Sequence, residues 1–143
     1  MRRLIILILC FQFAFVVSAE PQEFGQISLK IKTIEVNVEY ADTYELRAQG
    51  LMFRKFLCPD CGMFFRFGNP RLAGIWMKNT FVPLDVAFIR KDGVITDIKA
   101  LVPHDLTSIN SSKIVLYALE MNQGWFKKNG ISVGDTVQIS PSL

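Results

Sequence analysis

Two apolar segments joined by an Asp-Gly turn constrain this fold more than any other feature of the sequence. Residues 84–90 and 94–101 are rich in branched and aromatic side chains, and Lys91, Asp92 and Gly93 separate them. Because Gly accepts the positive φ angles that a tight turn between antiparallel strands needs, this segment predicts a β-hairpin.

Further strands are predicted on both sides of this hairpin. From residue 33 the chain alternates, with Ile34, Val36 and Val38 on one face and polar residues on the other, which is the period of a half-buried strand. Other strands are predicted at 62–67, 73–80, 114–120 and 135–140, with a Gly68-Asn69-Pro70 turn after the first of these.

Two short helices are also predicted. Asp42 as N-cap and Glu45 three residues later form a capping-box pattern, and this helix should end near Gly50. A second helix should begin after Asn122 and close at Gly130. Many short strands with two brief helices favour a mainly β (α+β) fold, an antiparallel sheet rolled into a barrel or half-barrel.

The N-terminal segment has the pattern of a secretory signal peptide. Residues 1–19 begin with Arg2 and Arg3, continue as an apolar run, and end at Val17-Ser18-Ala19. We therefore predict cleavage between Ala19 and Glu20 and an exported protein, periplasmic or extracellular. Retention as an N-terminal anchor is the alternative, but a spanning helix needs about 20 apolar residues and this run is shorter.

Processing would leave an N-terminal lead at 20–32 and a single β-rich domain at 33–143. The loss of Arg2 and Arg3 lowers the formal net charge from +3 to +1. Because nucleic-acid binding requires a clustered basic face, we expect no nucleic-acid partner. We expect contact with the membrane only transiently, through the signal peptide, and a monomer that meets an unknown small molecule or protein.

Several short sequences resemble one bacterial and archaeal family, known as domain of unknown function 192. The residues that carry the resemblance are Gly50-Leu51-Met52-Phe53-Arg54, Gly62-Met63-Phe64-Phe65, Trp76-Met77-Lys78-Asn79-Thr80, Pro83-Leu84-Asp85, Leu119-Glu120, Gly124 and Gly134-Asp135. The resemblance spans roughly residues 33–140 and implies a compact, β-rich fold that is frequently exported. It implies no established activity.

The segment 76–80 interleaves large apolar side chains with a cation, an amide and a hydroxyl. On a strand, Trp76, Lys78 and Thr80 would share one face. One hypothesis is a pocket for a small polar ligand, since such pockets combine apolar walls with a few convergent polar groups. Its residues would be Trp76, Lys78, Asn79, Thr80, Asp85 and Glu120. The alternative is structural: Trp76 in the core, Asn79 and Thr80 at a corner, and Asp85 bound to backbone N–H groups.

The chain offers little for catalysis or for a metal. Asp85 and Glu120 could form a glycosidase-like acid/base pair, but no spacing in the sequence supports that geometry. His104, the only histidine, follows Val102-Pro103 and is expected to be a solvated loop residue. A structural zinc needs four ligands, and only His104 accompanies the two cysteines left after processing. We therefore expect no catalytic residue, no metal and no cofactor.

Cys58-Pro59-Asp60-Cys61 is the sharpest local motif. An exported protein meets an oxidising compartment, which favours a disulfide between Cys58 and Cys61. The motif also resembles that of thioredoxin-like redox proteins, in which it opens a helix. Here a strand is predicted downstream. The sequence therefore favours a non-catalytic small-ligand-binding or interaction module, and a thiol-disulfide redox protein is the alternative.

Overall fold

The computed structural model describes residues 23–140, so the predicted signal peptide with its Ala19–Glu20 cleavage site lies outside the described residues. The elements are β1 (Gly25–Ile31), β2 (Ile34–Ala41), α1 (Tyr44–Gln49), β3 (Gly62–Arg71), β4 (Gly74–Ile75), β5 (Leu84–Ile89), β6 (Ile95–Leu101), β7 (Ile109–Asn110), β8 (Val115–Asn122), α2 (Trp125–Lys128) and β9 (Val137–Ile139).

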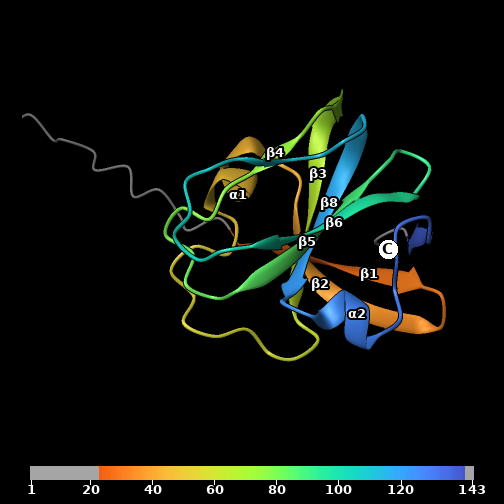
Figure 1. Ribbon diagram of the computed structural model, residues 1–143, viewed down its shortest axis with the longest axis horizontal. Helices are drawn as coiled ribbons and strands as arrows, with labels where there is room; N and C mark the ends of the chain where they lie inside the picture. Colours follow the sequence, from red (N-terminus) through yellow and green to blue (C-terminus); the bar gives the residue numbers. More distant parts are fainter. Residues whose placement is uncertain (1–22, 141–143) are drawn as a thin grey trace, which may run out of the picture.

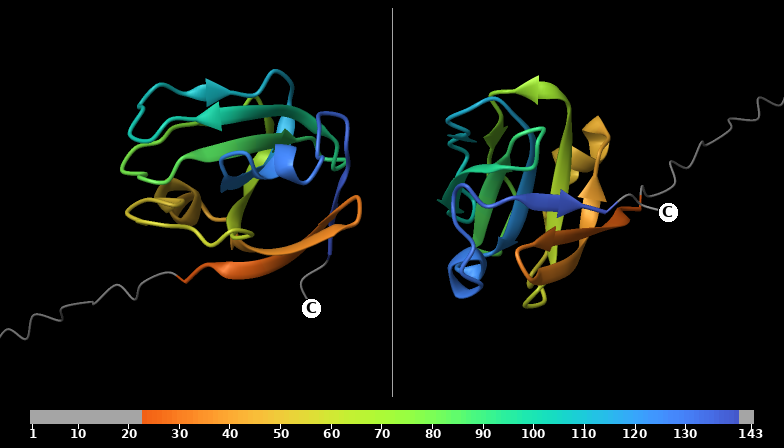
Figure 2. Two further views of the ribbon diagram at one scale, coloured as in Figure 1. Left: turned by 60° about the horizontal axis from the view of Figure 1, so that its bottom comes forward. Right: turned by 90° about the vertical axis from the view of Figure 1, so that its right-hand side faces the viewer.

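A curved seven-stranded sheet in the order β6-β5-β8-β3-β2-β1-β9 forms the body of the molecule, and β4 and β7 form a separate two-stranded sheet. Figure 2 shows β1 and β2 curling round to stand opposite β5 and β6, so the large sheet makes a half-barrel. The predicted fold class is confirmed, with one correction: β2 and β3 are parallel, and the sheet is mixed. Parallel neighbours need a crossover connection, and α1 with residues 50–61 provides it.

The two ends of the large sheet approach each other where the predicted hairpin turns. Val94 forms an isolated antiparallel bridge with Thr136, just before β9. The N–H of Val137 donates to the carbonyl of Gly93 at 2.8 Å. Gly93 has φ 87°, and a Cβ there would collide with that part of β9. The predicted Asp-Gly hairpin is confirmed as β5–β6, and its glycine also allows the half-barrel to close at one end.

The predicted N-terminal lead at 20–32 is wrong over most of its length, because residues 25–31 form β1. This strand pairs with β2 along its whole length, from Gly25–Tyr40 to Ile31–Ile34. Ile27, Leu29 and Ile31 are buried, so the domain begins at Gly25. The hairpin turn between the strands is made by Lys32, with φ 56°, and Thr33, a pair that lacks the glycine of common tight turns.

The predicted turn at Gly68-Asn69-Pro70 is also wrong. β3 continues through these residues to Arg71, and its pairing with β8 shifts register between Arg66 and Arg71. Such an irregularity lets a strand accommodate glycine and proline while it bends.

The two predicted helices are confirmed, with different N-terminal caps. The Oγ1 of Thr43, not Asp42, accepts from the N–H of Leu46 at 3.2 Å, and α1 ends at Gly50. Gly124 precedes α2 and provides no side-chain cap. The helix closes at Gly130 as predicted: the Gly130 and Ile131 N–H groups donate to the carbonyls of residues 127 and 126 in a Schellman pattern.

The buried apolar side chains form two clusters, one on each face of the sheet. One cluster fills the half-barrel and includes Phe64, Leu119 and Phe126 of α2. The other includes Phe65, Val86 and Leu46 of α1. Figure 1 shows α1 and β4 near each other, with α2 away from them. Within residues 23–140, no helix has the length and apolar character needed to span a bilayer.

Candidate functional site

A cavity of about 260 Å³ lies between α1, β4 and the large sheet, and we call it the α1–β4 cavity. Most of its wall is apolar or backbone. The lining residues are Tyr44, Arg47, Ala48, Gln49, Gly50, Leu51, Met52, Phe65, Phe67, Arg71, Gly74, Ile75, Trp76, Thr80 and Glu120. Three of the six residues predicted for a ligand site, Trp76, Thr80 and Glu120, therefore share one cavity.

Glu120 is the buried charged-type side chain of this cavity. It lies on β8, between Met63 of β3 and Val86 of β5, its cross-strand partners. Both neighbours are completely buried, and Glu120 itself is only 5% exposed. Side chains of directly opposed residues lie on the same face of a sheet, so the carboxyl group is flanked by a thioether and an isopropyl group.

The Glu120 carboxyl has no hydrogen-bonding or ionic partner among the described residues. None of their ion pairs includes it. Every fully enclosed side-chain N or O atom among them has a partner, so the carboxyl oxygens, which have none, are not fully enclosed. Because Glu120 lines the cavity, these oxygens are open to it. Burial disfavours the charged form and raises the pKa of Glu120 to about 8, so the group is mainly a neutral carboxylic acid at pH 7.

Trp76 lies at the mouth of the cavity, and its predicted strand is shorter than expected. Of residues 73–80, only Gly74 and Ile75 form a strand, β4. Trp76 is 51% exposed, so the alternative that placed it in the core is wrong. The Lys78 ammonium lies over its ring, 5.3 Å from the ring centroid, in a cation–π contact.

A turn at residues 77–80 separates the predicted face into two parts. The Thr80 N–H donates to the Met77 carbonyl at 3.2 Å, and Asn79 has φ 52°. Asn tolerates this left-handed conformation better than most residues. The turn leaves Lys78 exposed and directs Thr80 inward, where it is 5% exposed. The expected corner role of Asn79 and Thr80 is confirmed, and the expected shared face of residues 76, 78 and 80 is wrong for Thr80.

Four of the short sequences that carry the family resemblance contribute to this cavity. The N–H of Phe53 donates to the carbonyl of Asn79 at 2.8 Å, which joins segment 50–54 to segment 76–80. Gly50, Leu51 and Met52 line one side, and Trp76 and Thr80 line another. A third short sequence contributes Phe65 and a fourth contributes Glu120.

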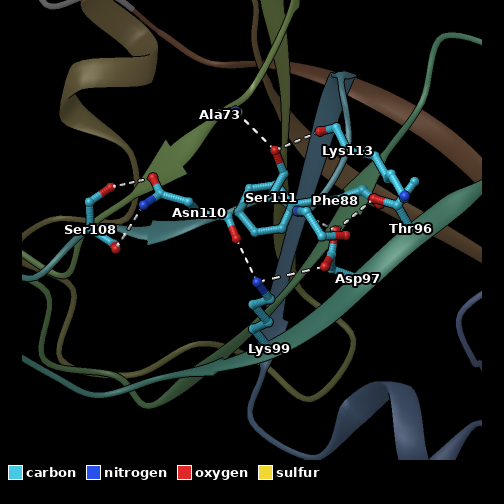
Figure 3. A network of polar contacts seen from close by, with 10 residues as sticks. Ala73, Phe88, Thr96, Asp97, Lys99, Ser108, Asn110, Ser111 and Lys113 are labelled. Atoms are coloured by element: carbon cyan, nitrogen blue, oxygen red, sulfur yellow. Dashed lines mark hydrogen bonds and ion pairs between the residues drawn. The ribbon is translucent and has the colours of Figure 1, made fainter.

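A network of polar contacts holds β4 in position over the sheet (Figure 3). The Ser111 Oγ accepts from the Ala73 N–H at 3.0 Å and donates to the carbonyl of residue 113 at 2.8 Å. Asp97 of β6 accepts from the N–H of residue 112 at 3.0 Å, and the Lys99 Nζ donates to the carbonyl of residue 110 at 2.6 Å. The network thus ties β7 and the residues after it to β6 and to Ala73, which precedes β4; Trp76 directly follows β4.

Asp85 is not part of the cavity. It is the cross-strand partner of Met121, so its side chain lies on the face of the sheet opposite to that of Glu120. Its Oδ2 accepts from the Gly124 N–H at 2.7 Å, as the structural alternative predicted. The two carboxyl groups therefore do not meet as an acid/base pair.

His104 is exposed in the loop between β6 and β7, as expected. Its ring packs edge-on against Phe81, with the two ring centroids 4.9 Å apart. Among the described residues, no cluster of three or more His, Cys, Asp or Glu side chains has the arrangement of a metal site.

The Cys58 and Cys61 sulfurs lie at disulfide-bonding distance, with their Cα atoms 5.0 Å apart. The loop that they close is held to α2 and to the end of β8: the Asp60 carboxylate accepts from the Trp125 Nε1–H at 2.9 Å, and the Asn122 Nδ2 donates to the carbonyl of Cys58 at 2.7 Å. Strand β3 follows directly at residue 62, so the pair does not open a helix.

Two cationic groups at the cavity were not predicted from sequence. Arg47 belongs to α1 and Arg71 ends β3, and both line the cavity. The Arg47 Nη1 donates to the carbonyls of Asp42 at 2.5 Å and Arg66 at 2.9 Å. A surface arginine on a short helix carries no sequence signal for a site.

A larger hollow of about 550 Å³ lies over β1, β2 and β9. Four of its polar side chains pair with each other, Ser28 with Asn37 and Lys30 with Glu35. The α1–β4 cavity is therefore the better candidate site.

Comparison with known proteins supports the expected family. The model of domain of unknown function 192, described as an uncharacterized ACR, matches residues 27–139. A crystal structure from Sinorhizobium meliloti 1021, provisionally assigned as a transcription regulator, is 38% identical, with a TM-score of 0.80, over 84% of this chain and 98% of that one. A protein of unknown function from Novosphingobium aromaticivorans DSM 12444 is 31% identical, with a TM-score of 0.73, over 85% and 91% of the two chains. A search of the curated proteins gave no match.

Proposed function

This chain belongs to the domain of unknown function 192 family, which brings no assigned activity, and we propose that it is a non-catalytic module that binds a small molecule in the α1–β4 cavity. The observation that carries this proposal is the Glu120 carboxyl, buried in apolar surroundings and open to the cavity without a partner among the described residues. Because its oxygens open on the cavity, a ligand with a hydrogen-bonding group can pair with this carboxyl directly, in apolar surroundings where such a bond is favourable.

The shape and composition of the cavity support the same proposal. Its volume of about 260 Å³ suits a molecule of small size, and Phe65 and Phe67 provide apolar walls. Half-exposed Trp76 at the mouth offers an aromatic surface that a bound molecule would cover. Such a combination of apolar wall and few polar groups is typical of ligand sites.

The non-catalytic part of the proposal rests on the chemistry of the lining residues. Glu120 is the only carboxyl among them, and no histidine or cysteine accompanies it. General acid/base catalysis of hydrolysis commonly needs two positioned groups, and Asp85 faces the other side of the sheet.

Export and a monomeric state belong to the same proposal, and the pairing of basic side chains with carboxylates supports the absence of a nucleic-acid partner. Five basic side chains of the described residues pair with carboxylates, at Lys30, Lys32, Arg54, Arg90 and Lys99. The transcription-regulator assignment of the Sinorhizobium protein is therefore not extended to this chain. Amino-terminal sequencing of the protein recovered from its native cells tests export, and a start at Glu20 is the expected result.

The two tryptophans allow a direct test of ligand binding. Trp76 lies at the cavity, whereas Trp125 is buried beside Asp60, so their indole N–H resonances report on the site and on the rest of the fold. A fragment library should contain molecules that shift the Trp76 resonance and leave the Trp125 resonance in place.

Variants at Glu120 complete this test. Glu120→Leu should lower the affinity of the fragments that bind, because it replaces the hydrogen-bonding group with an apolar side chain of similar size. Asp85→Asn, on the opposite face of the sheet, is the matched control and should leave binding unchanged. If no fragment shifts Trp76, or if Asp85→Asn weakens binding as much as Glu120→Leu, the proposed function is wrong.

A further inference from the structure

The charged groups that line the α1–β4 cavity are two arginines and one buried carboxyl. Arg47 and Arg71 line the cavity from α1 and from the end of β3, and Arg71 is exposed. Lys78 lies on the exposed ring of Trp76. The single acidic group is Glu120, which is buried among apolar side chains.

Neither arginine of the cavity is neutralised by a carboxylate of the described residues. Their ion pairs involve Lys30, Lys32, Arg54, Arg90 and Lys99 instead. Two carbonyl oxygens hold one nitrogen of Arg47 in place, and a guanidinium has five N–H donors in total. Apart from these two bonds through one nitrogen, Arg47 makes no side-chain hydrogen bond among the described residues, so its other donors can meet an additional acceptor.

The interior has the opposite requirement. A neutral carboxylic acid donates one hydrogen bond through its O–H, and the Glu120 group has no protein acceptor within the described residues. The same cavity is also lined by Phe65, Phe67, Leu51 and Ile75. A ligand that fills it would therefore contact apolar side chains as well as the arginines and Glu120.

We propose that the α1–β4 cavity is specific for small organic anions, whose anionic group lies at Arg47 and Arg71, whose apolar body contacts the aromatic wall, and whose far end accepts a hydrogen bond from Glu120. This inference rests on the proposed function and defines its ligand class. Arginine suits the anionic end because its planar fork matches the two oxygens of a carboxylate. A cationic ligand would meet the positive charges of the two arginines that line the cavity.

A matched set of probes tests the charge preference. They are 3-(4-hydroxyphenyl)propionate, its primary amide and 3-(4-hydroxyphenyl)propylamine, which share the hydroxyphenyl-propyl skeleton and carry an anionic, a neutral and a cationic terminal group. The shift of the Trp76 indole resonance measures the affinity of each, with Trp125 as the internal reference. The anion should bind more tightly than the amide, and the amine should bind most weakly.

Two arginine variants locate the preference in the cavity. Arg71→Gln should lower the affinity for the anion by about fivefold, as expected for a partly solvated ion pair, and should leave the affinity for the amide unchanged. Arg66→Gln removes the same charge from the same strand, but Arg66 does not line the cavity, so this control should leave the anion unaffected.

The pH dependence tests the interior end. The titratable or charged groups that line the cavity with Glu120 are Tyr44 and Arg47 of α1 and Arg71 of β3, and the arginines stay charged throughout. Ionisation of Glu120 removes its donor and adds a repelling charge. Raising the pH from 6 to 9 should therefore lower the affinity for the anion by about tenfold. The Glu120→Gln variant keeps a donor that cannot ionise, so its affinity for the anion should not depend on pH.

The possible outcomes separate the two proposals. If the amide or the amine binds as tightly as the anion, or if Arg71→Gln has no more effect than Arg66→Gln, the anion inference is wrong while the small-ligand function stands. If none of the probes and no library fragment shifts the Trp76 resonance, both fall.

Discussion

Replacement of Glu120 by Gln should change the pH dependence of stability in a direction that burial alone determines. The native pKa of Glu120 is about 8 and the ordinary value is 4.5. Below pH 4.5 the carboxyl is protonated in both states and costs nothing through ionisation. As the pH rises, the unfolded chain loses this proton first, so the native state becomes progressively less stable until the native group also ionises.

The size of the effect follows from the two pKa values. Between pH 4.5 and 8 the free energy of unfolding falls by about 1.4 kcal/mol for each pH unit through this group. The accumulated loss is about 3 kcal/mol at pH 7 and about 5 kcal/mol above pH 8. Glu120→Gln has no such titration, so its stability relative to the unsubstituted protein should increase by these amounts from pH 4.5 upward.

Urea denaturation of both proteins at several values between pH 4.5 and 9 measures this difference. All other titrating groups are common to the two chains and cancel, and any fixed cost of burying the amide shifts the difference by a constant. Asp85→Asn controls for exchange of a carboxyl for an amide on the same sheet. If the difference in stability between Glu120→Gln and the unsubstituted protein is the same at pH 5 and at pH 8, the reasoning about burial of this carboxyl is refuted.

Three further substitutions should lower the free energy of unfolding, each through one local feature of the structure. Thr43→Ala removes the side-chain acceptor at the start of α1 and should cost about 1 kcal/mol, whereas Thr43→Ser should retain most of it; equal losses in urea melts would contradict the cap. Gly62→Ala places a Cβ against the β8 backbone at Glu120 and should cost about 2 kcal/mol through overpacking, and an unchanged melting temperature would show that the strands separate easily. Cys58→Ser combined with Cys61→Ser should cost about 2 kcal/mol through the opened loop, and reduction of the unsubstituted protein should reproduce that loss in the same assay.

The accuracy of the sequence-based predictions depends on how local the signal is. The hairpin of β5 and β6 was predicted closely because Asp92-Gly93 marks the turn and apolar residues flank it. β1 was missed although Ile27, Leu29 and Ile31 alternate as clearly as the residues of β2. Its turn at Lys32 and Thr33 lacks the usual turn residues, and the backbone adopts φ 56° at Lys32 because pairing along the whole hairpin compensates for the strain.

The site was predicted only in part because its geometry is not local. Trp76, Thr80 and Glu120 were named from their residue types, and the fold brings all three to one cavity. Asp85 was named for the same reason but lies on the other face, since its position one residue away from Val86 reverses the direction of its side chain. Arg47 and Arg71 were not named, because exposed arginines in isolation are ordinary.

The sequence by itself determined the elements of this protein: the strand periods, the Asp-Gly turn, the glycine that ends α2, and the close spacing of Cys58 and Cys61. These features depend on residues near each other in the chain. Only the tertiary structure decided that β2 and β3 run parallel, that the Glu120 carboxyl lies between two apolar strands without a protein partner among the described residues, and that α1 and β4 enclose a cavity above it. The physical reason is that burial and partnership are properties of neighbours in space, and strand order, which brings those neighbours together, is not encoded in any one segment.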